Sequence, residues 1–108
     1  MAAQHTFSRA TREALQLLGT RVAVARRERR MTATELAQRA GVSPVTIRKV
    51  ERGDPTVGLG VAFEVAALVG VPLFDESAER RSLDLDRAGD RLAVLPKRVR
   101  PREVDDAF

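Results

Sequence analysis

Two adjacent cations, Arg48 and Lys49, lie on a short segment with the sequence Val-Thr-Ile-Arg-Lys-Val-Glu-Arg over residues 45–52. Their side chains carry hydrogen-bond donors that match O6 and N7 on the major-groove edge of guanine. Val45 and the methyl group of Thr46 suit contact with the methyl group of thymine. If a helix presents them on one face, these residue types suit contact with base edges in double-stranded DNA, with Arg52 at the edge of the groove.

The residues before this segment predict a short helix with a defined beginning and end. Thr32 followed by Glu35 forms a capping box, in which each side chain bonds the backbone amide of the other residue. Leu36 and Ala37 are expected to face inward. Gly41 can adopt the left-handed conformation that is needed just past a helix end.

A second short helix is predicted directly afterwards, and it would carry the two cations. Ser43 is a favourable N-cap, and Pro44 suits the first helical position because its missing N–H would have no partner there. Ile47 and Val50 share one face and are expected to be buried, and Gly53 ends the helix. Two helices with this turn predict a helix-turn-helix that reads DNA; the alternative is an αα-hairpin of a helical bundle.

Hydroxyl groups and free amides at the starts of these two helices suit phosphate oxygens. Each position also has a simpler explanation as an ordinary solvated side chain. The candidate DNA-binding residues are Thr32, Thr34, Ser43, Pro44, Val45, Thr46, Arg48, Lys49 and Arg52.

The same segment carries a family resemblance. The residues that carry it are Leu36-Ala37, Ala40-Gly41-Val42-Ser43, Ile47, Glu51 and Gly53, followed by the run at 63–71. The segment resembles the helix-turn-helix of the XRE and phage lambda repressor superfamily over residues 15 to 74. The resemblance implies an all-α bundle of four to five short helices and a homodimer that reads a two-fold operator.

The resemblance also implies a structural ion pair between Arg26 and Glu51, which would fix the angle between the first and third helices. Arg26 belongs to a basic cluster at 26–30, which is either a solvated helix end or a clamp on the DNA backbone. Many relatives carry glutamine at the positions of Ala33 and Pro44, and these glutamines often contact phosphate or adenine. Because these glutamines are absent, we expect Arg48 and Lys49 to make more of the contacts with DNA.

Residues 8–74 form the expected DNA-binding domain. Outside the helix-turn-helix, their sequence predicts two more helices. The first begins near Ser8 or Thr11 and ends at Arg30, and its apolar stripe is Leu15, Leu18, Val22 and Ala25. The other spans about residues 59–69, with its buried side at Val61, Val65, Leu68 and Val69, and Phe63 as a core or dimer aromatic. Leu73 and Phe74 are expected in the core.

Residues 75–108 form an expected appendage for dimerisation or partner binding. Leu83, Leu85, Ala88, Leu92 and Leu95 recur at helical spacing, and this stripe needs the main domain, a second subunit or another protein to cover it. Pro96 ends the helix, a basic and extended stretch follows at 97–102, and an acidic end closes the chain at 103–108. The tail is either a binding segment or disordered, and its basic part is an alternative DNA contact.

A repressor-like domain with this short tail resembles the DNA-binding antitoxins that are encoded with HipA-type kinase toxins. The residues that carry the resemblance are Leu95-Pro96-Lys97-Arg98-Val99-Arg100 and Val104-Asp105-Asp106. It implies a dimer that represses its own operon and binds a kinase-type toxin.

Composition and charge exclude several other functions. Residues 1–74 hold 11 Lys or Arg and 6 Asp or Glu, whereas residues 75–108 hold 8 and 9, so the positive charge lies on the DNA-binding half. There is no cysteine, and the single histidine, His5, lies near the end of the chain. We therefore expect no enzyme activity, no cofactor and no metal. No apolar run is long enough to cross a membrane, and a cytoplasmic protein is expected.

Three hypotheses remain open at this point. The protein is a DNA-binding regulator that also holds a toxin, a stand-alone repressor whose tail only dimerises it, or a protein-interaction module on the same fold.

Overall fold

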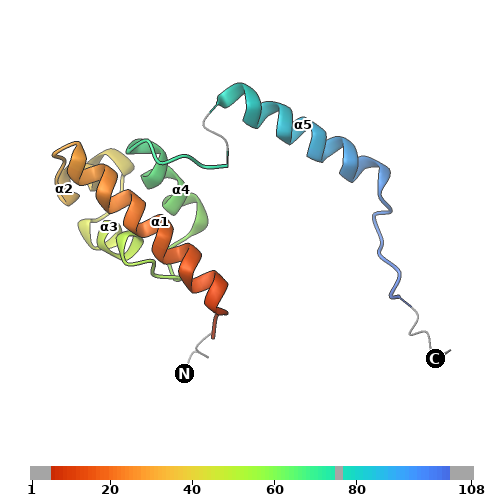
Figure 1. The fold of residues 1–108 in the computed structure, drawn as a ribbon, viewed down its shortest axis with the longest axis horizontal. Helices are drawn as coiled ribbons and strands as arrows, with labels where there is room; N and C mark the ends of the chain where they lie inside the picture. Colours follow the sequence, from red (N-terminus) through yellow and green to blue (C-terminus); the bar gives the residue numbers. More distant parts are fainter. Residues whose placement is uncertain (1–5, 75–76, 103–108) are drawn as a thin grey trace. The chain divides into compact units, whose positions relative to one another are not determined.

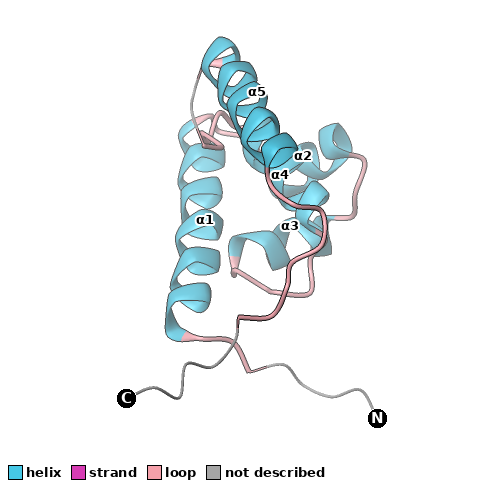
Figure 2. Cartoon of the chain, turned by 90° about the vertical axis from the view of Figure 1, so that its right-hand side faces the viewer, coloured by secondary structure: helices cyan, strands magenta, loops and turns pink. Residues whose placement is uncertain are grey.

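The computed structural model describes residues 6–74 and 77–102, which contain five helices and no strand (Figures 1 and 2). The helices are α1 (Arg9–Glu28), α2 (Ala33–Ala40), α3 (Pro44–Glu51), α4 (Leu59–Leu68) and α5 (Ala78–Val94). The all-α prediction is confirmed. The chain divides into one unit of residues 1–73 and another of residues 74–108. The predictions for His5 and for the acidic end at 103–108 lie outside the described residues.

Side-chain caps explain where α1 and α2 begin. The Ser8 hydroxyl accepts a hydrogen bond from the Thr11 amide at the start of α1. At the start of α2 the Thr32 hydroxyl accepts from the Glu35 amide at 3.0 Å, and the Glu35 carboxylate accepts from the Thr32 amide at 3.4 Å. These bonds satisfy amides that have no partner inside their helix. Both helices therefore begin at or next to the residues that the capping rules predict.

The end of α1 differs from the prediction. The helix ends at Glu28, not Arg30, because Arg30 adopts the left-handed conformation with φ 53°. The Arg30 amide donates to the Arg27 carbonyl at 2.9 Å, and the Met31 amide donates to the Arg26 carbonyl at 3.1 Å. This is the Schellman pattern, whose left-handed position is usually glycine, so an arginine at position 30 does not indicate a helix end.

Glycines produce the same helix end after α2 and α3. Gly41 has φ 70° and Gly53 has φ 72°, a backbone conformation that other residues adopt at a cost. The Val42 amide then donates to the Ala37 carbonyl. The predicted left-handed turn between α2 and α3 is therefore present, and it sets the direction in which α3 leaves the turn.

The core of the first unit combines side chains from α1 to α4. Its buried hydrophobic residues are Val22, Met31, Leu36, Ala37, Ile47, Val50, Val65, Ala66, Val69 and Val71. Of the predicted stripe of α1, Val22 is fully buried, while Leu18 and Ala25 pack against the core. Ile47 and Val50 fix one face of α3 inward, so the opposite face of that helix points to solvent.

The expectation for residues 73 and 74 is only half correct. Leu73 packs against the core, but Phe74 is 94% exposed and has φ 64°. The hydrophobic run therefore stops contributing to the core at Leu73, where the first unit ends.

Within the second unit, α5 has no buried residue. Leu85, Ala88 and Leu92 recur at steps of three and four, which places them on one side of the helix, and Leu95 follows three residues later as its C-cap. Leu83 lies two residues from Leu85 and therefore does not share that side, so the predicted five-residue stripe is wrong at this member. Leu85 and Leu92 are 74% and 72% exposed.

Close packing between α1 and α3 depends on a glycine that the sequence analysis did not single out. Gly19 is buried, and a Cβ atom there would meet the backbone carbonyl oxygens of Val50 and Glu51, the latter at 2.7 Å. These are backbone atoms, so they cannot move aside as a flexible side chain does. Glycine at this position lets α1 approach the end of α3 directly (Figure 1).

Gly19→Ala is expected to lower the free energy of unfolding by about 2 kcal/mol or more, because the added methyl group forces α1 away from α3. Urea denaturation followed by circular dichroism measures this change. Gly60→Ala in α4 is the matched control: nothing lies within 4 Å of its Cβ position, so we expect no loss and a gain of up to about 1 kcal/mol. Equal effects of the two substitutions would contradict the proposed constraint.

Candidate nucleic-acid interface

The outward face of α3 carries most of the predicted base-contacting residues. Arg48 and Arg52 are exposed, and Val45 is 51% exposed although it is apolar. Lys49 is half-buried and lies one turn from Val45 on the same side. These four residues form one continuous strip along the helix, on the side opposite Ile47 and Val50. The structure therefore brings the four predicted base-contacting residues together.

Other predicted contacts lie at the edges of this strip. Pro44 and Thr46 are half-buried, and Ser43 is exposed. The Ser43 hydroxyl accepts from the Thr46 amide at 3.2 Å and lies 3.1 Å from the Thr46 hydroxyl. These bonds form the cap of α3, so both hydroxyl groups already hold a structural partner in the unbound protein.

The start of α2 offers a second, smaller group. Thr32 and Thr34 are exposed, but the Thr32 hydroxyl is engaged with Glu35, at 3.1 Å from its carboxylate oxygen. The Thr32 side chain therefore supports α2 before any ligand arrives. Thr34 remains an exposed hydroxyl in the first turn of the helix.

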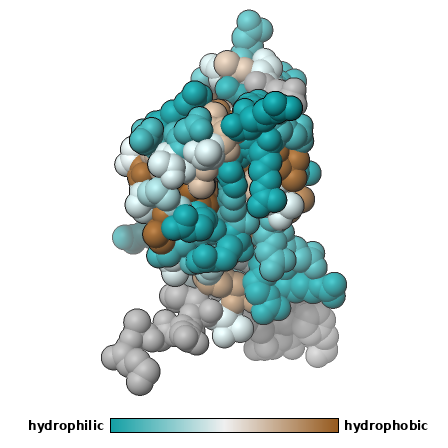
Figure 3. All heavy atoms as spheres, turned by 90° about the vertical axis from the view of Figure 1, so that its left-hand side faces the viewer, coloured by the Kyte–Doolittle hydropathy of each residue, from teal (hydrophilic) through white to brown (hydrophobic). Residues whose placement is uncertain are grey.

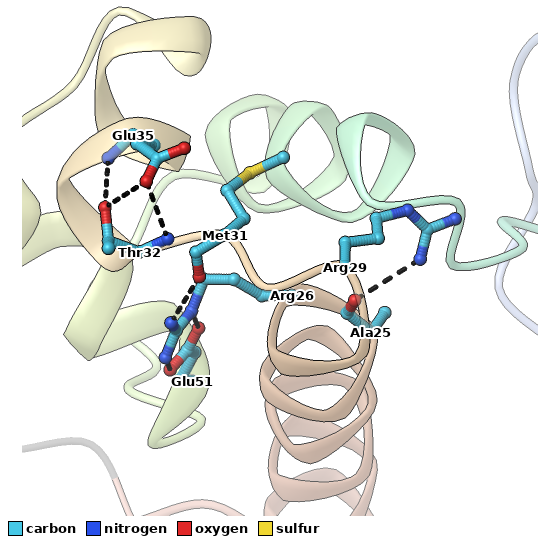
Figure 4. A network of polar contacts seen from close by, with 7 residues as sticks. All are labelled: Ala25, Arg26, Arg29, Met31, Thr32, Glu35 and Glu51. Atoms are coloured by element: carbon cyan, nitrogen blue, oxygen red, sulfur yellow. Dashed lines mark hydrogen bonds and ion pairs between the residues drawn. The ribbon is translucent and has the colours of Figure 1, made fainter.

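Arg26 and Glu51 meet in a two-point ion pair between α1 and α3 (Figure 4). The Arg26 Nε donates to Glu51 Oε2 at 2.7 Å, and Nη2 donates to Oε1 at 3.0 Å. The third nitrogen, Nη1, donates to the carbonyl of Met31 at 2.9 Å. The two side chains are only 13% and 12% exposed, so this pair fixes three segments to one another.

The same pair removes negative charge from the candidate interface. Glu51 is the only acid in α3, and it faces inward onto Arg26. Hydrogen bonding to Glu51 raises the pKa of Arg26 above its ordinary value, so the guanidinium keeps its charge beside the carboxylate. The outward side of α3 is left with cations alone, which favours a polyanion.

One acid does border the strip. Asp54 follows α3, and its carboxylate lies 3.8 Å from the Arg52 guanidinium. The hydroxyl and the amide of Thr56 both donate to Asp54, and these bonds lower the pKa of that carboxyl group. Asp54 is therefore held in a turn beside Arg52 and limits the positive charge at this edge.

The basic cluster at 26–30 does not act as one unit. Arg26 is committed to Glu51, and Arg29 donates to the Ala25 carbonyl at 3.3 Å (Figure 4). Arg30 forms the left-handed turn after α1. The cluster therefore divides among structural roles, and of its arginines Arg27, Arg29 and Arg30 are exposed, with the acid Glu28 exposed among them.

The surface around α2 and α3 is mostly hydrophilic, with small apolar groups between the polar side chains (Figure 3). Such a surface suits a charged ligand better than a large apolar partner. Within the described residues no group of three or more metal-ligating side chains is present, and no helix is long and apolar enough to cross a membrane.

Comparison with known proteins agrees with this geometry. A family model described as Helix-turn-helix matches residues 22–75, which include α2, α3 and α4. The chain belongs to this helix-turn-helix family, which is of the XRE type and binds DNA. No curated protein and no solved structure matches the chain.

Sequence reasoning missed two features of residues 8–74. The bond from Arg26 to the Met31 carbonyl has no side-chain signature, because a backbone oxygen is its acceptor. The close approach at Gly19 depends on a contact between helices far apart in the sequence. The only available signal was a glycine inside an otherwise regular helix, which often marks close packing.

Glu51→Ala is expected to lower the free energy of unfolding by about 3 kcal/mol, because it leaves Arg26 largely buried without its partner. The pair Arg9–Glu13 is exposed, so Glu13→Ala should cost less than about 0.5 kcal/mol and serves as the control. Both values come from urea denaturation at neutral pH. A loss for Glu51→Ala as small as that of the control would show that the pair does not hold α1 to α3.

Proposed function

We propose that the protein is a sequence-specific transcriptional repressor, with residues 8–74 as its DNA-binding domain. The observation that supports it is the outward strip of α3, where Val45, Arg48, Lys49 and Arg52 lie together while the only acid of the helix is paired on the other side. In this proposal α3 enters the major groove of an operator and acts by binding, not by catalysis. The protein then works in the cytoplasm, where its operator lies.

Different residues make different kinds of contact in this mechanism. Arg48 and Lys49 donate to guanine edges, and Val45 and Thr46 contact thymine methyl groups. The free amides at the starts of α2 and α3 hold phosphate oxygens, with Thr32, Thr34, Ser43 and Pro44 around them. Arg52 contacts the backbone at the edge of the groove. The phosphate contacts fix the register, and the base contacts give specificity.

The double substitution Arg48→Ala with Lys49→Ala is expected to weaken operator binding by about 100-fold or more, since each good base contact contributes about 1–3 kcal/mol. An electrophoretic mobility assay on the DNA upstream of the protein's own gene measures this loss. Both side chains lie outside the core, so the circular dichroism spectrum should not change.

A matched control removes the same charge elsewhere. Arg21→Ala with Arg87→Ala changes two exposed arginines outside the helix-turn-helix and should weaken binding by only a few-fold. If the α3 variant were folded and bound the operator as tightly as wild type, the proposed reading by this face would be wrong.

We also propose that residues 75–108 join two copies into the homodimer that a two-fold operator requires. The exposed side of α5 with Leu85, Ala88, Leu92 and Leu95 has the heptad spacing of a helix that pairs with another helix. In an antiparallel pair, Leu85 of one copy packs against Leu95 of the other. Asp84 of each copy then lies beside Arg91 of the second copy, so the charges are self-complementary.

Reversing one charge tests this pairing. Asp84→Arg places like charges beside each other twice in the dimer, and we expect the dimer to dissociate about tenfold more readily. Asp84→Arg combined with Arg91→Asp restores opposite charges and should restore the affinity, as measured by sedimentation equilibrium. Because Asp84 also pairs with Arg80 in its own helix, the helicity of each variant is compared by circular dichroism. If the single Asp84→Arg variant and the double variant had the same dimer dissociation constant, the antiparallel arrangement would be wrong.

A second candidate function is that of an antitoxin that also binds a HipA-type kinase toxin. The feature that favours it is the apolar side of α5, which no described residue of its own unit buries. Co-expression with the product of a neighbouring kinase-like gene tests it. A complex that survives gel filtration supports the antitoxin role, and separate elution leaves the stand-alone repressor.

A further inference from the structure

The basic segment after α5 has features that α3 and the dimer proposal do not use. Helix α5 ends before Leu95, whose backbone is extended with ψ 146°. Residues 96–102 form no helix or strand. Their sequence is Pro-Lys-Arg-Val-Arg-Pro-Arg, with four cations, and residues 91–102 contain no acid. Three acids follow at 103–106, outside the described residues.

The chain bends at Lys97 and Arg98 and has no regular structure at 99–102, and the two prolines keep helical backbone out of this segment. Pro101 fixes its own φ and disfavours helical backbone at Arg100, and Pro96 does the same for Leu95. When the segment is drawn out along a groove, Arg98, Arg100 and Arg102 alternate with their neighbours and fall on one edge about 6–7 Å apart. All three are exposed, and none has a hydrogen bond or ion pair with another described residue.

A row of guanidinium groups on a thin extended chain fits the minor groove of A·T-rich DNA. That groove is only about 6 Å wide, so it admits an extended segment but no helix. Narrow A·T tracts carry an enhanced negative potential that attracts inserted arginine side chains. Single-stranded nucleic acid fits less well, because its binding sites stack bases on aromatic side chains and residues 91–102 have none.

The length of the second unit is sufficient for a contact beside the operator half-site. Helix α5 is about 25 Å long, and the extended residues 95–102 add a similar length. A minor groove lies about half a helical turn, roughly 17 Å, from the centre of the major groove that α3 enters. A tethered contact of this kind adds affinity through its high effective concentration.

We propose that Arg98, Arg100 and Arg102 form a minor-groove arm that binds A·T-rich DNA flanking the site read by α3. This proposal rests on the proposed function, and it adds a second DNA-binding site with its own base preference. Because the arm lies outside the core of the bundle, its substitution does not disturb the fold.

The test measures the arm alone, in the full chain with Arg48→Ala and Lys49→Ala. Fluorescence anisotropy follows binding to three 20-base-pair duplexes of A·T, inosine·C and G·C pairs. Inosine·C lacks the minor-groove amino group of G·C, so it resembles A·T in the minor groove and G·C in the major groove. We expect equal affinity for A·T and inosine·C and about tenfold weaker binding to G·C.

Two variants of the arm identify the residues responsible. Changing the three arginines to Ala should remove the preference and lower the salt slope of log K by about 2–3, because three phosphate-neutralising cations are lost. Changing them to Lys keeps the charge and should keep the slope, but it should lose the preference for A·T and inosine·C.

Other outcomes overturn the proposal. Equal binding to all three duplexes, even with a reduced salt slope for the Ala variant, would mean phosphate contacts only and no minor-groove arm. No change of any kind in the Ala variant would mean that the segment serves a protein partner instead. A failure of the proposed reading by α3 is recognised separately. In that case the Arg48→Ala and Lys49→Ala protein with an intact arm would bind the operator as tightly as wild type.

Discussion

The contact between α1 and α3 is the constraint on which the rest of the DNA-binding unit depends. Gly19 has no side chain, so the backbones of α1 and α3 can lie closer together than any other residue would allow. Beside this contact, Arg26 joins Glu51 by two hydrogen bonds. The third donor of Arg26 holds the Met31 carbonyl and so ties the loop before α2 to the same point. A single arginine thus sets the position of α3 relative to both of the segments that precede it.

The same arrangement explains why one short helix can serve two opposite environments. Ile47, Val50 and Glu51 face inward, two as apolar groups and one as a paired charge. Arg48 and Arg52 are left on the outside with no acid of their own helix nearby. Pairing the acid of α3 with Arg26 therefore holds α3 against α1 and leaves cations as the only charges of the helix on its exposed face.

Local rules predicted much of this structure, and contacts between distant segments account for what they missed. The capping box at Thr32, the cap at Ser43 and the left-handed Gly41 depend on neighbours in the sequence, so the residues alone indicated them. The end of α1 was missed because an arginine holds the left-handed position. Phe74 was misplaced because apolar character alone does not say where the core stops. The Arg26–Glu51 pair came from the family resemblance, and the DNA-contacting roles on α3 remain predictions.

Helix α3 has only eight residues. A peptide of that length does not stay helical in water by itself, so the exposed strip of α3 exists only while α1, α2 and α4 hold the helix in place. Any duplex that binds this surface must therefore stabilise the native state, by an amount that grows with the concentration of free sites. In a cell, molecules seated on DNA would resist proteases longer than those in free solution. The lifetime of the protein would then report how many of its sites are occupied.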